Sequence, residues 1–263
     1  MHVKDGLRQS PQLPAMANER SGARLITETT AEPVVASAAA RGVVDGEATA
    51  RLIRVTQQAG ARAAEIGSLL PPRAQAEGTL RRLHETALLQ FAERGFHAVS
   101  VRDLTRALGM QPSSLYAHLQ SKQHLLGELI RVGHEEHRDQ LRLALLEAGN
   151  DPHEQLAALT RAHVRVHATY PLLTRLCNRE LGSLLDEDKA SVLAIRLDAN
   201  RLFLDVVERG QRLGVFSPVD PMLAVAAIGA MGIRVAEWWS PDAGVTVEEV
   251  EATYADFARK LLS

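Results

Sequence analysis

Histidines are the side chains best suited to chemistry here, since imidazole acts as acid, base or metal ligand near neutral pH. The segment His134–His137 reads HEEH, one residue short of the zinc-protease motif between its glutamate and its second histidine. His163 and His167 stand four residues apart, so they share a helix face and could hold one metal ion. Because neither a cysteine nor a third histidine accompanies them at a telling spacing, we interpret the pair as polar or pocket-lining and predict no metal site.

Other groups that could support catalysis are few. The single cysteine, Cys177, follows the apolar residues Leu173 and Leu176, which favours a buried, unreactive thiol over a redox sensor. A single cysteine also excludes an intramolecular disulfide and suits a reducing compartment. The sequence contains no Gly-rich phosphate loop and no nucleophile elbow. We therefore expect no enzyme and no cofactor, with a small metal-dependent enzyme built on His163 and His167 as a distant alternative.

A second group of polar residues, from residue 100 to residue 122, is suited to binding DNA. Hydroxyl and imidazole groups donate to phosphate oxygens, and Lys122 lies in the first turn of a predicted helix, where backbone N–H groups also favour an anion. Gln111 and Ser113 are the best candidates to reach base edges, because a glutamine can bind adenine through two hydrogen bonds. The predicted DNA-binding residues are Ser100, Arg102, Gln111, Ser113, Ser114, Tyr116, His118 and Lys122.

Short helices must position these groups, and the apolar pattern predicts them. Residues 80–94 carry an apolar stripe at helical spacing, and the glycine that follows can end that helix. Ser100 caps a second helix with the acid Asp103 three residues on, and Gly109 ends it. The third helix, residues 112–119, begins at a proline, which the first turn of a helix tolerates.

The second and third helices together form a helix-turn-helix, a motif whose second helix can enter the major groove of DNA. The motifs in order are Gly95-Phe96, Ser100-Val101, Leu104, Leu108-Gly109-Met110, Ser114-Leu115-Tyr116-Ala117-His118-Leu119 and Ser121-Lys122 with Leu125. This order resembles the N-terminal domain of the TetR family of one-component repressors. Two residues depart from the family pattern. Gln111 replaces a capping Ser or Thr, a change that could alter base preference or weaken the cap by about 1 kcal/mol, and Leu119 replaces a Phe.

Composition and charge agree with a helical protein that carries a DNA-binding head. Aromatic residues make up 4% of the chain, which favours an all-α fold over a β-sandwich. The formal net charge of −2 conceals an asymmetry between two regions. A head of residues 79–126 has six basic and three acidic residues, whereas a body of residues 127–263 has 15 basic and 21 acidic residues. A basic head beside an acidic body suits a protein that presents only its head to DNA.

Residues 1–78 form an extension outside the family pattern, which we predict to be disordered or partly helical; Met16 is a candidate later start. Residues 47–70 carry apolar residues at helical spacing and predict a helix there, although two glycines weaken it. No apolar run approaches the roughly 18 residues that span a membrane, and the N-terminus lacks a signal-peptide pattern. We expect a cytoplasmic protein with no membrane partner, organised as an extension, a head of residues 79–126 and a body of residues 127–263.

The body is predicted to consist of helices that bind a ligand and pair two copies of the chain. One long helix, residues 122–148, joins head to body and is the natural lever between ligand and DNA. A later helix, Met222–Trp239, is apolar on nearly all sides, so it must be covered on all sides. The last helix, capped at Thr246, is expected to carry Val250, Tyr254, Phe257, Leu261 and Leu262 on one face. Two such helices from each copy would form a four-helix dimer interface, the alternative being core helices of a monomer.

An apolar cavity with a few polar groups is a common site in a helical bundle. The candidate ligand-binding residues are Arg161, His163, Arg175, Arg179 and Trp238, because arginines can bind a carboxylate or the phosphates of a coenzyme A moiety. The segments 163–167, 179–181, 214–216 and 238–239 loosely resemble a TetR subgroup of lipid-catabolism regulators that respond to acyl-CoA thioesters. The resemblance implies a dimeric repressor of double-stranded DNA, released from a near-palindromic operator by an acyl-CoA or lipid-derived effector. The alternative is a helical binding module without DNA affinity.

Overall fold

The computed structural model describes residues 69–74, 77–111 and 120–263, and every regular element in these ranges is a helix. The predicted all-α fold is therefore confirmed. The chain divides into two compact units, residues 1–50 and 51–263, and all described residues belong to the second. The predicted helix at 112–119 lies outside the described residues, as does nearly all of the helix predicted at 47–70.

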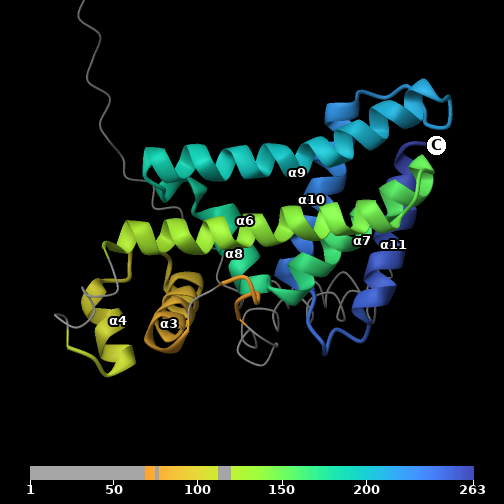
Figure 1. Cartoon of the computed structure of the whole chain (residues 1–263). Coiled ribbons are helices and arrows are strands. Elements are labelled where there is room, and N and C mark those ends of the chain that lie inside the picture. The colour runs from red at the N-terminus through yellow and green to blue at the C-terminus, as the bar shows by residue number, and fades with distance from the viewer. Residues whose placement is uncertain (1–68, 75–76, 112–119) are drawn as a thin grey trace, which may run out of the picture. The chain divides into compact units, whose positions relative to one another are not determined.

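The helices of the second unit are shown in Figure 1. In chain order they are α3 (Gly78–Arg94), α4 (Val101–Leu108), α6 (Lys122–Glu147), α7 (Pro152–Thr169), α8 (Pro171–Arg179), the short 3-10 helix η2 (Leu181–Ser183), α9 (Asp186–Arg212), α10 (Pro221–Trp238) and α11 (Val247–Leu261). Helices α3 and α4 lie near the N-terminal end of α6, α9 lies along it, and α10 and α11 lie toward its other end (Figure 1). The long helix α6 therefore joins the head to the body, as predicted, and it crosses the domain boundary expected at residue 126.

Local capping signals set several of the helix ends. The Ser100 side chain accepts a hydrogen bond from the Asp103 backbone N–H, and the Asp103 carboxylate accepts one from the Ser100 backbone N–H, which completes the predicted capping box. Thr246 and Glu249 form a second box at the start of α11. Gly109 ends α4 in the left-handed conformation, with φ of 66°, that a side chain would strain. These ends are encoded within three or four residues of sequence.

Two large apolar cores share α6 as a common wall. The head-side core gathers residues of α3, α4, α8 and the first half of α6, among them Leu83, Phe91, Leu104, Leu126, Ile130 and Leu173. The body core gathers residues of α7, α9, α10, α11 and the second half of α6, among them Leu141, Leu159, Phe203, Val207, Ile228 and Ala258. Helix α6 thus contributes buried leucines to both, with His134 and Glu136 buried between them.

Helix α10 corrects the expectation that no segment approaches the length of a membrane span. Its 18 residues have a mean hydropathy of 1.3, which makes it long and apolar enough to cross a membrane by length and composition. A single helix of this kind is weak evidence for a span, since core helices have the same composition. One face packs inward through residues such as Ile228 and Val235, while Met222 is 58% exposed and Leu223 is 70% exposed.

Helix α11 leaves part of its predicted apolar face exposed. Val250 and Leu262 are buried, whereas Phe257 is 46% exposed and Leu261 is 41% exposed. The inward face is completed instead by small residues, Ala255 and Ala258, which let α11 approach α7 closely. Helices α10 and α11 therefore both leave apolar side chains uncovered within one chain.

Candidate functional site

The described part of the head contains four of the eight residues predicted to bind DNA. Arg102 and Gln111 are exposed, and among the described residues no carboxylate pairs with Arg102. The Ser100 hydroxyl donates to an Asp103 carboxylate oxygen at 2.6 Å, so the capping box already uses its proton. Those predicted contacts that fall within residues 112–119 lie outside the described residues. They are Ser113, Ser114, Tyr116 and His118.

Lys122, the remaining predicted DNA contact, forms hydrogen bonds within the head. Its ammonium group donates to the carbonyl oxygens of Phe96 at 2.9 Å and Val99 at 2.8 Å, and lies 4.1 Å from the centre of the Phe96 ring. Burial lowers the pKa of Lys122, an effect that the negative charge of Glu180 partly offsets. The Lys122 ammonium therefore holds the loop between α3 and α4 onto the start of α6, and two of its three protons are committed to that loop.

Further polar contacts join the head to the body. In α3, Nε2 of His84 lies 2.8 Å from a carboxylate oxygen of Glu128, a residue of α6. His97, in the loop after α3, lies 3.2 Å from the hydroxyl of Ser183 in η2. The head is thus attached both to α6 and to the segment that follows α8, so a shift of either would be transmitted to it.

A cavity of about 360 Å³ opens in the body between five helices, α6 to α10. Its walls are mostly apolar, with polar groups at a few points, and its lining includes Met222, Val225, Ile233, Thr174, Asn178 and Asn200. Ligand pockets usually measure about 300 to 1,000 Å³ and combine apolar walls with a few placed polar groups. The cavity has the size and lining of a site for a small apolar molecule or part of a larger one.

Four histidines line this cavity, two on each of two adjacent helices, and we call them the histidine layer: His134 and His137 of α6, and His163 and His167 of α7. Burial lowers the pKa of His134 and of His163 to about 4, and that of His167 to about 3. His137 keeps some accessible surface, and its pKa is lowered well below 6.5 by burial first and then by the neighbouring imidazoles. All four rings are therefore neutral at physiological pH.

Arg196 of α9 faces the same cavity. Its positive charge contributes to the lowered pKa of each histidine in the layer. No carboxylate pairs with this guanidinium in the part of the chain that the structure describes. An unpaired cation at the wall of an apolar cavity attracts an anionic group of a ligand.

The five predicted ligand-binding residues do not converge on one site. His163 lies in the cavity, whereas Arg161 lines a separate groove on α6 and α7. Arg179 donates to both oxygens of Glu237 at 2.9 Å, and burial lowers the pKa of the adjacent Arg175. Trp238 packs against a small apolar cluster of α7, α10 and α11 that includes Val164 and Val235.

Sequence reasoning missed His137 and Arg196 as members of the site. The sequence offers no third histidine at a telling spacing from His163 and His167, yet in space His137 of the neighbouring helix lies 2.7 Å from His163. The available signal was the pair His134 and His137, three residues apart and so on one face of the predicted lever helix. Arg196 offered no sequence signal that distinguishes it from a surface arginine.

Two family descriptions match the described head and body. "Bacterial regulatory proteins, tetR family" matches residues 83–129, and "Tetracyclin repressor-like, C-terminal domain" matches residues 149–262. The curated "HTH-type transcriptional repressor KstR2" of Rhodococcus jostii is 28% identical over 180 residues, which cover 67% of this chain and 87% of that protein.

Solved structures show the same arrangement of helices. The TetR family transcriptional regulator PfmR of Thermus thermophilus is 32% identical with a TM-score of 0.62, and the match covers 68% of this chain and 97% of that one. AibR, whose structure was solved in complex with isovaleryl coenzyme A and operator DNA, is 23% identical with a TM-score of 0.61, covering 70% and 97%.

Proposed function

The chain belongs to the TetR family of transcriptional regulators, and from this premise we propose that it is a repressor released from DNA by a small-molecule effector. The effector binds in the cavity at the histidine layer, and the helix predicted from the sequence at residues 112–119 enters the major groove. One observation supports this proposal most directly. A single helix, α6, binds the head through Lys122 at one end and lines the cavity with His134 and His137 further along.

The coupling follows from the length of that connection. Lys122 and His137 are 15 residues apart on α6, a separation of about 22 Å along a continuous helix. A helix transmits a shift or tilt along its axis because its backbone hydrogen bonds keep it rigid. An effector that wedges α6 away from α9 or α10 would therefore move the loop that Lys122 holds. The size of the effect is limited by the difference in effector affinity between the two positions of α6.

DNA binding requires two copies of the head. Twofold pairing would place the two copies of the helix predicted at residues 112–119 on successive major grooves of a near-palindromic operator. We propose that the exposed apolar faces of α10 and α11, with Met222, Leu223, Phe257 and Leu261, form the dimer interface. Such an interface would account for apolar residues that a single chain leaves exposed.

The cavity favours an effector with an apolar body and an acidic or acyl end. Its apolar walls would hold the apolar part, and Arg196 would face the anionic or carbonyl end. At about 360 Å³ the cavity suits the acyl or lipid-derived part of a molecule rather than an entire coenzyme A conjugate. AibR, a structural neighbour, was solved with isovaleryl coenzyme A, which supports acyl-CoA thioesters as the first class to examine.

Selection of bound fragments from genomic DNA by the purified full chain tests this function. Affinity for the selected fragment should fall steeply with salt, by about 0.9 in log–log slope for each phosphate contacted, and should exceed affinity for random DNA. A panel of acyl-CoA thioesters should then weaken binding, whereas free coenzyme A should not. A helical binding module without DNA function would enrich no fragment and show no salt-dependent binding, which would overturn the proposal.

A matched pair of variants locates the effector. Arg196→Gln should weaken the response to an active thioester at least tenfold while leaving operator affinity unchanged in its absence. Arg161→Gln, which alters an arginine of the separate groove, serves as the control and should keep the response. Loss of the response in the control alone would place the effector in the groove and contradict the proposed cavity.

A further inference from the structure

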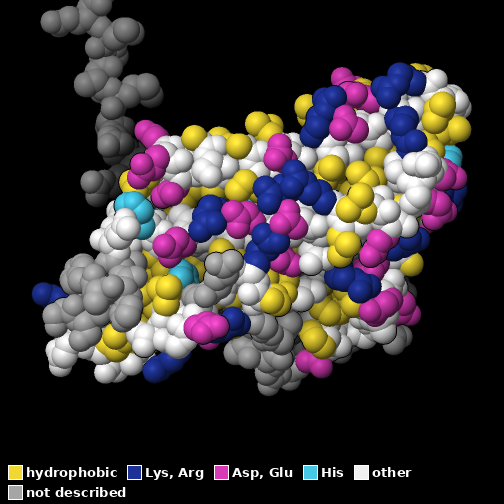
Figure 2. Space-filling model, viewed as in Figure 1, with side chains coloured by type: hydrophobic (Ala, Val, Ile, Leu, Met, Phe, Trp, Pro, Cys, Tyr) yellow, Lys and Arg dark blue, Asp and Glu magenta, His cyan; other side chains and the backbone are white. Residues whose placement is uncertain are grey.

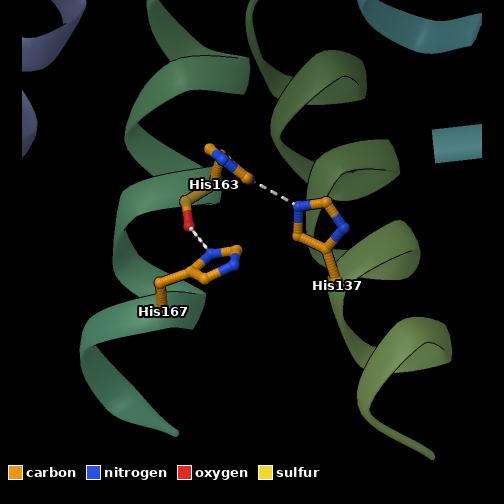
Figure 3. Close-up of side chains that lie close together, drawn as sticks. All are labelled: His137, His163 and His167. Carbon is orange, nitrogen blue, oxygen red and sulfur yellow. Dashed lines mark hydrogen bonds between the residues drawn. The ribbon is translucent and has the colours of Figure 1, made fainter. Parts of the chain in front are cut away.

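Three imidazoles of the histidine layer converge on one point, as Figure 3 shows. His137 approaches from α6, and His163 and His167 approach from successive turns of α7. One ring nitrogen of each lies within 4.8 Å of the corresponding nitrogen of the other two. The rings meet edge to face, with centres 4.5 to 5.6 Å apart. The three rings are therefore not stacked, and one nitrogen of each can face a common point between them.

The hydrogen bonds of the cluster fix which nitrogens carry protons. His163 Nε2 lies 3.1 Å from the carbonyl oxygen of Gly229, so Nε2 carries the proton and donates it. His163 Nδ1 is then an acceptor, and it receives the Nε2–H of His137 at 2.7 Å. His167 Nδ1 donates to the carbonyl oxygen of His163 at 2.8 Å, which leaves the lone pair on its Nε2. Among the described residues no group donates to that lone pair.

From this arrangement we propose that His137, His163 and His167 bind a divalent transition-metal ion of the zinc type. The ligand atoms are Nε2 of His137, Nδ1 of His163 and Nε2 of His167. When the ion binds, the proton of His137 moves from Nε2 to Nδ1 within the neutral ring, so no net charge leaves the protein. Three neutral imidazoles with an open fourth position are a known ligand set for Zn²⁺.

The groups behind the ligands support this assignment. Histidines that bind metals usually donate their other ring N–H to a carbonyl or carboxylate, which orients the ring. His163 and His167 already do so, toward the backbone carbonyls of Gly229 and His163. Because the low pKa values keep the imidazoles unprotonated, an ion need not displace an acid proton at neutral pH. Two of the three ligands are therefore oriented and deprotonated in advance.

The required movement is small. Metal–nitrogen bonds of about 2.05 Å in a tetrahedral site place ligand nitrogens about 3.3 Å apart. The 2.7 Å contact between His137 and His163 would open, and separations of up to 4.8 Å would close, by side-chain rotation. His163 itself has little freedom, since its ring packs so closely on Gly232 that a Cβ there would collide with it. His163 is thus the fixed ligand, and His137 and His167 adjust to it.

The fourth position faces the cavity. His134, one turn before His137 on α6, is 8% exposed, and its Nε2 has no hydrogen-bond partner among the described residues. This nitrogen could accept a hydrogen bond from a water molecule or hydroxide on the ion. The positive charge of Arg196 opposes a dication in the same cavity, so we expect the fourth ligand to be an anion that both charges attract.

Metal binding is measured on the full chain alone and does not depend on the proposed regulatory function. Protein stripped with a chelator should take up one Zn²⁺ per chain and, with Co²⁺ as a spectroscopic substitute, develop the visible absorption of a tetrahedral site. His137→Gln and His167→Gln should each weaken Zn²⁺ binding more than about 100-fold. His153→Gln, which alters a histidine of α7 outside the layer, should leave it unchanged.

A second measurement needs no variant. X-ray absorption of the Zn²⁺-loaded natural chain should show three imidazole nitrogens at about 2.0 Å and no sulfur at about 2.3 Å. Stoichiometric binding with this spectrum would support the site even if a histidine variant fails to fold. Absence of binding at micromolar Zn²⁺, binding that survives both variants, or a sulfur ligand from Cys177 would overturn the proposal. None of these results depends on whether the chain binds DNA.

Discussion

The two halves of α6 are held in different ways. The first half is buried through Leu125, Leu126, Leu129 and Ile130 in the head-side core, with Lys122 bound to carbonyls at its start. In the second half the neutral side chains of His134 and His137 line the cavity, and the next buried leucine is Leu141. An apolar contact resists displacement over its whole area, whereas a polar layer beside a cavity can exchange partners. The histidine layer is therefore where α6 is easiest to move.

The surface gives a second contrast. Figure 2 shows acidic and basic side chains interspersed along the visible face of the body. Charged side chains of the body are also paired across helices, as Arg142 of α6 is with Asp198 of α9 at 3.6 Å. Exposed pairs of this kind contribute little to stability. Arg102 of the head and Arg196 of the cavity have no carboxylate partner among the residues that the structure describes. They are more informative, because each faces a site where an anion is proposed.

The largest expected effect comes from the core of the head. Phe91 is 2% exposed and meets Phe96 edge to face at 5.2 Å. Phe91→Ala should lower the free energy of unfolding by about 3 to 5 kcal/mol, measured by urea denaturation. The matched change Phe203→Ala in the body core should cost a similar amount. Because α6 belongs to both cores, each variant should unfold in one transition, and two separate transitions would contradict a shared wall.

The pH dependence of stability distinguishes the histidine layer from the rest of α6. Unfolded histidines take up protons near pH 6.5, whereas His134, His163 and His167 do so only near pH 3 to 4 when folded. The unfolded state therefore binds more protons between these values, and stability falls as the pH decreases from about 6.5 toward 4. Each such histidine contributes up to about 1.4 kcal/mol per pH unit.

Replacing one member of the layer should reduce this slope. His167→Gln should flatten the plot of unfolding free energy against pH, measured by denaturation between pH 7 and pH 5. His97→Gln, which alters an exposed histidine of the head, provides the comparison and should leave the slope unchanged. Equal slopes for the natural chain and His167→Gln would show that the layer does not remain neutral.

Two glycines of α10, Gly229 and Gly232, test how tightly the His163 ring is held. A Cβ at Gly232 would collide with the His163 ring, so Gly232→Ala should cost about 1 to 3 kcal/mol through overpacking. A Cβ at Gly229 meets nothing within 4 Å, so Gly229→Ala should stabilise the helix by up to about 1 kcal/mol. Thermal unfolding measures both. The same sign for the two changes would mean that His163 is not held against Gly232.

Two basic residues of the head are expected to differ in stability, and one of them, Arg102, gives the smallest expected effect. Lys122→Met removes two hydrogen bonds from a charged donor and should cost about 1.5 to 3 kcal/mol of stability. Arg102→Ala, at an exposed position, should change stability by less than about 0.5 kcal/mol. It should nevertheless reduce the salt slope of DNA binding by about one. A stability loss at Arg102 equal to that at Lys122 would reject this division of roles.

The sequence was sufficient for the parts of the molecule that short segments determine. The capping box of Ser100 and Asp103, the left-handed Gly109 and the capped start of α11 follow from neighbours within four residues. The contact of His137 with His163 spans 26 residues, and that of Lys122 with Phe96 spans 26. Such contacts depend on the rotation of one helix against another, which the apolar pattern limits only loosely. The cavity is formed by five helices, so of its polar residues only His163 was predicted to bind a ligand, and only His163 and His167 were interpreted as polar or pocket-lining.

The most direct test of the central claim is the affinity of the full chain for its selected genomic fragment, measured by fluorescence anisotropy with and without saturating acyl-CoA thioester. We expect the thioester to weaken binding at least tenfold in the natural chain and to have little effect on Arg196→Gln. Unchanged affinity across the thioester panel would contradict control of the head from the cavity. An equal loss of affinity in Arg196→Gln would contradict the proposed position of the effector.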